Sequence, residues 1–150
     1  MARRLSKREK QHYRAGGFRL EGRRYSQAAA ERALLHAAAR ILRIWGAGPR
    51  ATRATLALPS SKALLRWRCG RAAIRSETQE RVAVTIAIYA RLVETNDHLD
   101  LKPLPPLKRA GRKSLSGQEV LAAGRLSDLL ALWRQLVLAE EAAARRRVRR

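Results

Sequence analysis

The sequence contains few residues of several types, and each shortage excludes a class of structure. Aromatic residues make up only 5% of its 150 positions, so a core must be built from aliphatic side chains. Ala, Leu and Arg dominate instead, and all three favour helices. The composition therefore predicts an all-α fold, in a chain whose length suits one domain or two small subdomains.

Cysteine occurs once, at Cys69, which excludes an intramolecular disulfide and suits a reducing compartment. No apolar run reaches the length that spans a bilayer, and the basic N-terminus is not followed by the apolar region of a signal peptide. These absences predict a cytoplasmic protein with no membrane partner.

Signatures of catalysis and of metal binding are also missing. His12, His36 and His98 have no ligand spacing with one another or with Cys69, and there is no glycine-rich phosphate loop. We interpret His36 as a solvated helix position and Cys69 as an incidental small residue. The sequence therefore predicts a protein that is not an enzyme and that needs no cofactor and no metal.

Carboxylates are scarce, with 12 Asp and Glu against 33 Lys and Arg, for a net charge of +21. Between Arg32 and Ser76 there are ten cations and no carboxylate, although a merely solvated surface usually mixes both signs. Such a charge predicts a polyanionic partner, nucleic acid first and an anionic membrane second. For the charge alone, the arginine-rich composition typical of a GC-rich genome is the alternative explanation.

Two segments divide the chain. Residues 1–25 mix cations with three glycines and predict a basic flexible arm, which either reaches a DNA groove or is an inert extension. Residues 97–115 are rich in proline and cations and predict a linker. Helical subdomains are predicted on either side of that linker, over residues 26–96 and 116–150, and the second ends in a basic tail.

The first subdomain begins with two predicted helices. One starts at a Ser26 cap and ends at Gly46 and Gly48, and the next runs from Pro49 to Ala57. The apolar face of the first helix is the i, i+4, i+7, i+8, i+11 series of Leu34, Ala38, Ile41, Leu42 and Trp45.

A third helix is predicted from a cap at Ser60 or Ser61 to Gly70. On a helical wheel Leu64 and Trp67 face inward. The residues that face outward are Lys62, Leu65, Arg66 and Cys69.

Short helices joined by a tight turn, the third with outward cations, match the helix-turn-helix plan in which that helix enters the major groove of DNA. Lys62 and Arg66 are expected to contact guanine edges or phosphates. Two serines at the helix start are expected to bind phosphate oxygens, and two arginines of the second helix to hold the DNA backbone. The predicted DNA-binding residues are Arg50, Arg53, Ser60, Ser61, Lys62 and Arg66.

A fourth helix is predicted over residues 76–94, where Ser76 and Gln79 have capping-box spacing. Its apolar residues lie on two sides, so the helix is either central or buried between its own core and a second copy of the chain. One side holds Val82, Ile86, Tyr89 and Val93, and the other holds Val84 and Ile88.

In the second subdomain Gly124 ends a short helix, and Ser127 with Asp128 starts a long one. The apolar face of the long helix is broad and needs cover, either from the first subdomain or from a partner. That face comprises Leu126, Leu129, Leu130, Leu132, Trp133, Leu136 and Val137.

The stretch from "TRATLALPSSKALLRWRCG" to "IRSETQERVAVTIAIYARLVE" combines a "PSS" turn, an "RW" ending and a following "S-x-x-x-x-E-R" helix that leads to a Tyr. The segment "SLSGQEVLAAGRLSDLLALWRQL" places a glycine turn before a final amphipathic helix. In these features residues 28–139 resemble the Xre-like MbcA/ParS/Xre toxin-binding antitoxin family. The matching residues are Pro59, Ser60, Ser61, Arg66, Trp67, Gly70, Ser76, Glu80, Arg81, Tyr89, Gly124, Leu126, Leu129 and Leu130.

The resemblance implies a homodimeric antitoxin of a type II toxin–antitoxin module. Such a protein binds its own operator DNA through the helix-turn-helix to repress its operon. Its C-terminal subdomain covers a RES-domain toxin that consumes NAD. The fourth helix suits the homodimer contact. The residues expected to bind the toxin are Leu126, Leu130, Trp133, Arg134 and Val137.

Two alternatives stay open. The chain lacks the family's Pro near Gly117 and its Trp before the loop, which suits a stand-alone or phage-type helix-turn-helix regulator without a toxin partner. Arginine-rich arms with interspersed Tyr and Phe also bind structured RNA, so a basic RNA-binding protein is the second alternative.

Overall fold

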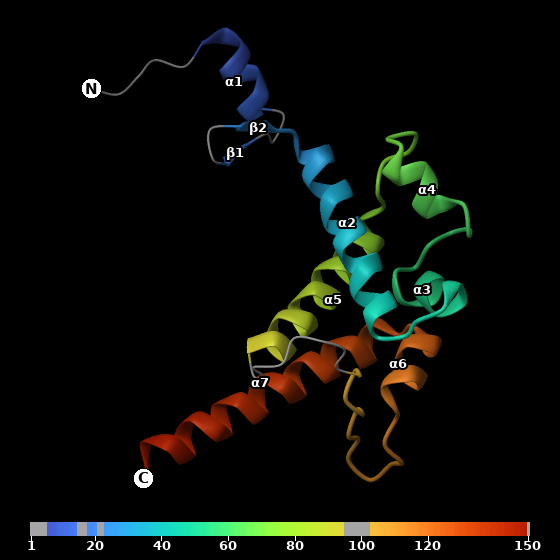
Figure 1. Ribbon diagram of the computed structural model, residues 1–150, viewed down its shortest axis with the longest axis vertical. Helices are drawn as coiled ribbons and strands as arrows, with labels where there is room; N and C mark the ends of the chain where they lie inside the picture. The colour runs from blue at the N-terminus through green and yellow to red at the C-terminus, as the bar shows by residue number, and fades with distance from the viewer. Residues whose placement is uncertain (1–5, 15–17, 21–22, 95–102, 150) are drawn as a thin grey trace.

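The computed structural model describes residues 6–14, 18–20, 23–94 and 103–149, and these residues are mostly helical (Figure 1). The helical class predicted from composition is therefore confirmed. Within this described part, no helix is both long enough and apolar enough to cross a membrane.

The N-terminal segment contains a short helix and a hairpin. Helix α1 spans Lys7–Arg14, and strands β1 (Phe18–Leu20) and β2 (Arg23–Tyr25) pair antiparallel. Figure 1 shows them outside the bundle that the other helices form. The sequence predicts only a flexible arm over residues 1–25, because its scattered apolar residues indicate no period.

Helix α2 spans Gln27–Ile44, and the predicted cap is confirmed: the Ser26 hydroxyl oxygen accepts a hydrogen bond from the Ala29 amide at 3.1 Å. The prediction for Leu34 is wrong, because this side chain is 50% exposed and Leu35 is buried in its place. Both residues fit a helical period, and packing against the rest of the bundle selects between them. The buried residues of this face are Leu35, Ala38, Ile41, Leu42 and Trp45.

Helix α3 spans Pro49–Thr55 and begins with proline, as predicted. It ends two residues before Ala57, the predicted boundary. Two residues later, Ala57 has a φ of 51°, in the left-handed region. A residue with a Cβ rarely adopts this conformation, which turns the chain sharply toward the next helix.

Helix α4 spans Ala63–Arg68 and has six residues, fewer than predicted. The prediction that a serine hydroxyl caps it is wrong, because Lys62 is the N-cap and no side chain bonds to the first turn. The main-chain oxygen of Ser60 accepts from the Ala63 amide at 3.2 Å instead. A hydroxyl caps a helix from the N-cap position, and Ser60 and Ser61 both precede that position.

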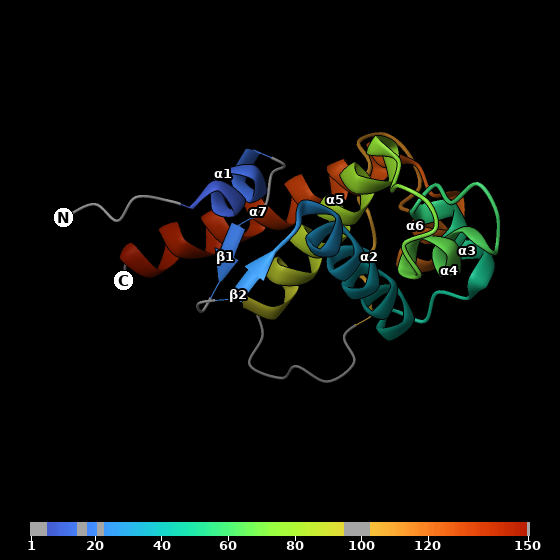
Figure 2. The ribbon, with the colours of Figure 1, turned by 90° about the horizontal axis from the view of Figure 1, so that it is seen from above.

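Helix α5 spans Ser76–Glu94 and lies between α2 and the C-terminal helix (Figures 1 and 2). The predicted capping box is absent: Ser76 is the first helical residue, and Gln79 Nε2 donates to the Ile74 carbonyl oxygen at 3.1 Å. Val82 and Ile88, predicted on different sides, are both buried because helices cover α5 on two sides.

Two leucines of the loop at residues 103–116 pack into the core. Leu104 and Leu107 are 5% and 2% exposed, and the main chains of Leu107 and Leu115 exchange hydrogen bonds at 2.8 and 3.0 Å. The sequence predicts a linker here from its prolines, and the first residues of that linker, 97–102, lie outside the described residues. The remainder is not a solvated spacer, because Leu104 and Leu107 are buried and Leu115 packs against the core.

Helix α6 spans Gly117–Ala123 and begins with a capping box. The Ser116 hydroxyl oxygen accepts from the Glu119 amide at 3.2 Å, and the Glu119 carboxylate accepts from the Ser116 amide at 2.7 Å. The hydrogen bonds from Ser116 hold the pKa of the Glu119 carboxyl below its ordinary value, and the positive charge of Lys113 adds to this effect.

Helix α7 spans Leu126–Val148 and follows Gly124, whose φ of 59° ends α6 as predicted. The predicted start at Ser127 and Asp128 is slightly late. Arg125 is the N-cap and makes no side-chain cap bond, so the chain gives no capping signal at the true start.

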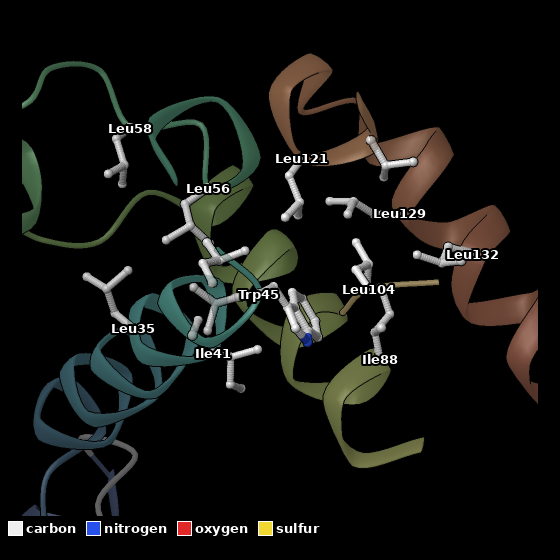
Figure 3. Close-up of a cluster of buried hydrophobic side chains, with 14 of the residues drawn as sticks. Leu35, Ile41, Trp45, Leu56, Leu58, Ile88, Leu104, Leu121, Leu129 and Leu132 are labelled. Carbon is white, nitrogen blue, oxygen red and sulfur yellow. The ribbon is translucent and has the colours of Figure 1, made fainter. Parts of the chain in front are cut away.

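One hydrophobic cluster joins these helices. Figure 3 shows side chains from α2, the α3–α4 turn, α5, the 103–116 loop, α6 and α7 that converge on it. The Trp45 and Tyr89 rings meet beside this cluster, with centroids 6.3 Å apart and planes tilted by 53°. The two predicted subdomains therefore share one core.

A buried guanidinium, that of Arg81 on α5, links the ends of two other helices. Its side chain is 12% exposed. Nη1 donates to the carbonyl oxygen of Thr55 at 3.2 Å, at the end of α3, and to the carbonyl oxygen of Gly124, at the end of α6. The last carbonyls of a helix have no partner within it, so one cation on α5 satisfies both ends.

Further contacts hold α3 against α6. The Thr55 hydroxyl donates to the Leu121 carbonyl at 2.9 Å in a buried site. At Gly124 an added Cβ would lie 2.4 Å from the Ala54 main chain, so only glycine permits this approach. The α3–α6 junction, defined by Ala54, Thr55, Leu121 and Gly124, is therefore both hydrogen-bonded and closely packed.

We predict that Arg81→Met lowers the free energy of unfolding by about 3 kcal/mol, because the carbonyls of Thr55 and Gly124 lose their donor while staying buried. Urea denaturation followed by circular dichroism measures the change. Arg75→Met is the matched control, since Arg75 is exposed and its guanidinium has no partner among the described residues; its effect should stay below about 0.5 kcal/mol. Equal losses in the two variants would contradict the role given to Arg81.

A pair of glycine variants tests the α3–α6 junction. Gly124→Ala should cost about 3 kcal/mol of unfolding free energy, from a left-handed alanine and from the clash with Ala54. Gly111 also has a positive φ, of 65°, but an added Cβ meets nothing within 4 Å. Gly111→Ala should therefore cost only about 1 kcal/mol. A similar cost at both positions would show that the junction is not tightly packed.

Candidate nucleic-acid interface

Helix α4 presents its cations to solvent and its indole to the core. Trp67 is 3% exposed and Ala63 is 4% exposed, whereas Lys62 and Arg66 are exposed. This orientation confirms the burial predicted from the helical wheel. Leu65, 63% exposed, lies on the same outer face, so the face combines two cations with one apolar side chain.

The exposed cations near α4 form no ion pair within the described part of the chain. Among the described residues, ion pairs join Arg81 to Glu77 at 3.5 Å and Arg91 to Glu140 at 2.6 Å, and none involves a cation of α2, α3 or α4. Free guanidinium and ammonium groups can bind phosphate without breaking an existing pair, and they release condensed counterions when they do so.

Arg50 and Arg53, both predicted to hold a DNA backbone, differ in what they contact. Arg50 is exposed in the first turn of α3. Arg53 donates from Nε to the Leu58 carbonyl oxygen at 3.3 Å and from Nη2 to the Pro59 carbonyl oxygen at 3.0 Å. Arg53 therefore holds the turn that leads to α4.

Ser60 and Ser61 are exposed but do not sit at a helix N-terminus that could bind an anion, because they precede the N-cap of a six-residue helix. The phosphate contact predicted for these two serines stays a prediction, and it would rest on their exposed hydroxyl groups. Ser61 instead lines a hollow of about 260 Å³ between α2, α3 and α4, together with Arg43 and Thr52.

Two arginines of α2 join this region, although the sequence analysis does not assign them to DNA. Arg43 lines the hollow beside Ser61. The Arg32 guanidinium lies next to Gly70, with Nη1 at 3.5 Å from the position of an added Cβ. In the sequence, both arginines lie in the stretch between Arg32 and Ser76 that contains no carboxylate. We call five cations of this region the basic surface: the half-buried Arg32 and the exposed Arg43, Arg50, Lys62 and Arg66.

The residues predicted to bind a toxin lie along one flank of α7. The centre of the buried face is Leu129 and Leu132, both fully buried against the core. Arg134 is exposed and Leu138 is 64% exposed on the outer side. The apolar members of the predicted set, which are half-buried between these two faces, are Leu126, Leu130, Trp133 and Val137.

An apolar groove of about 420 Å³ runs along α2 and α5. Its lining includes the half-exposed Leu34 together with Val82, Ile86 and Ala90. No Lys or Arg belongs to its lining, which sets it apart from the remainder of a chain with 33 such residues.

Comparisons with protein-family models, with curated proteins and with solved structures found no match for this chain. In the described ranges, no group of three or more His, Cys, Asp or Glu side chains is placed to hold a metal ion. His98 lies outside those ranges. The basic surface, the α7 flank and the α2–α5 groove are three distinct surfaces of the described residues.

Proposed function

We propose that this protein is a cytoplasmic, non-enzymatic DNA-binding antitoxin, in which α3, the following turn and α4 act as a helix-turn-helix on its own operator. One observation carries the proposal: Trp67 anchors α4 in the core, while Lys62 and Arg66 are exposed and pair with no carboxylate of the described residues. A helix held in this way presents its cations in a fixed direction, as major-groove recognition needs.

The two groups of cations have different tasks in this proposal. Lys62 and Arg66 on α4 contact guanine edges, and the exposed Leu65 between them suits the methyl group of thymine. Arg50, with Arg32 and Arg43 of α2, contacts phosphates, which positions the protein without specifying a sequence.

The resemblance to the Xre-like MbcA/ParS/Xre family extends the proposal to the C-terminal helix. The α7 flank would cover a RES-type toxin, with the half-buried Leu130 and Trp133 as apolar contacts and the exposed Arg134 as a polar one. Homodimerisation would use the cation-free groove of α2 and α5, where two copies of a +21 chain can approach without direct repulsion.

One observation favours a second candidate, a helix-turn-helix regulator without a toxin partner. The broad apolar face of α7 is already covered at Leu129 and Leu132 by the protein's own helices. Because the protein's own core already covers this part of α7, a toxin is not needed to bury it.

We predict that Lys62→Ala with Arg66→Ala abolishes preference for the protein's own upstream DNA. Loss of two base-edge contacts should weaken binding to that duplex by roughly 100-fold, while binding to a shuffled duplex changes much less. Fluorescence anisotropy with both duplexes over a salt series measures the two affinities. Lys108→Ala with Arg112→Ala removes the same charge from an exposed loop and should leave the preference intact. Preserved preference in the α4 double variant would refute α4 as the recognition helix.

Co-expression with the product of the neighbouring gene tests the antitoxin assignment. We expect the two proteins to co-elute in size-exclusion chromatography. Arg134→Glu should weaken the complex by roughly tenfold, while Arg112→Glu, the same charge reversal on an exposed loop, should not. If the unaltered proteins elute separately, the regulator without a toxin partner is the better description.

A further inference from the structure

The C-terminal end of α7 carries a cluster of arginines that neither α4 nor the α7 flank uses. All residues from 141 to 149 are exposed, and the last turns of the helix extend away from the bundle in Figure 1. Arg145, Arg146 and Arg149 line one open hollow of about 380 Å³, along with Leu138. This arginine cluster is therefore a distinct, strongly cationic surface.

Helical spacing places these three guanidinium groups on one side of α7. Positions 145, 146 and 149 span an arc of roughly 100° on a helical wheel, while Arg147 points to the opposite side. Glu141 lines the same hollow, yet no ion pair joins it to these arginines within the described ranges. The cluster thus faces solvent with three arginines against one carboxylate in the hollow, so it keeps an excess of positive charge.

The dipole of α7 alone does not explain this arrangement. Cations in the last turn of a helix stabilise it slightly, whichever side they occupy. Convergence of three guanidinium groups on one hollow is an additional feature, and it suits an anion with several oxygen atoms.

We propose that this arginine cluster is a second DNA-binding site, which holds the phosphodiester backbone of a duplex without reading its sequence. Arg145 and Arg149 are about 6 Å apart along the helix axis. Two nucleotide steps of one strand cover a similar axial distance of about 7 Å. The arginine spacing thus fits phosphates, which every sequence presents alike, so contacts of this kind position a duplex without specifying its sequence.

This site goes beyond the proposed operator reading by α4 and shares with it only the class of partner. Figure 1 shows α4 and the C-terminal end of α7 on opposite sides of the bundle. The cluster therefore either extends the contact along one duplex or holds a second duplex.

A triple variant of the full-length protein, Arg145→Ala with Arg146→Ala and Arg149→Ala, tests the site. Alanine favours the helix, so α7 should persist, which circular dichroism checks. Each lost phosphate contact lowers the slope of log affinity against log salt by about 0.9, so the slope on a shuffled duplex should fall by roughly 2 to 3. The ratio of affinities for upstream and shuffled duplexes should not change.

The matched control is Lys108→Ala with Arg112→Ala and Lys113→Ala, which removes the same charge from an exposed loop. Its salt slope should stay close to that of the unaltered protein. Equal slopes for the α7 and loop variants would overturn the proposal. So would a loss of affinity by the α7 variant for a hairpin RNA but not for duplex DNA, since the cluster would then be an RNA site.

Two further measurements separate this proposal from the function of α4. If the unaltered protein has no sequence preference and the α7 variant still lowers the slope, the cluster stands and operator reading fails. Capture of a second labelled duplex on bead-bound duplex, by the unaltered protein and not by the α7 variant, assigns the cluster to a second duplex. A lowered slope without such capture assigns it to the same duplex.

Discussion

The arrangement of the helices depends on one buried cation. The Arg81 guanidinium on α5 binds carbonyl oxygens at the ends of α3 and α6, so three helices are fixed by a single side chain. Arg53 then ties the end of α3 to the turn before α4 through the Leu58 and Pro59 carbonyls. The direction in which α4 presents its cations therefore follows from two arginines that are themselves bonded to the main chain.

A largely buried guanidinium restricts how the helices around it can pack. Removing a guanidinium from water is costly, and in the described part of the chain the Nε of Arg81 is buried with no hydrogen-bond partner. The carbonyl oxygens it does bind are compatible with only one placement of α3 against α6. Packing at Gly124 enforces the same placement, because any larger residue would strike Ala54.

Local signals in the sequence were sufficient for the existence of helices α2 to α7 and for the outer face of α4, but not for α1. Ser26, Pro49 and Gly124 each act within one helical turn, so their effect is readable from neighbouring residues. The burial of Trp67 was predictable from the helical period of apolar residues in α4. Leu34 and the capping serines were predicted wrongly, because the choice between adjacent positions depends on packing from other parts of the chain.

Long-range contacts were beyond the reach of these patterns. Arg81 follows Glu77 by four residues, which indicates an ordinary surface ion pair, and nothing local predicts that its guanidinium reaches the carbonyl of Gly124. Arg43 and Arg32 were recognisable only as part of a carboxylate-free stretch. The leucines at 104 and 107 lie among prolines, and their burial requires the core that the other helices provide.

The shared core limits how the molecule can be dissected. A fragment cut after α5 would keep α4 but leave the Arg81 guanidinium without the Gly124 carbonyl, and it would uncover Ile88, which Figure 3 shows close to Leu104. Freshly uncovered apolar surface promotes self-association in place of folding. Helices α3 and α4, for which we propose a contact with DNA, therefore depend for their folding on the helices that follow them in the chain.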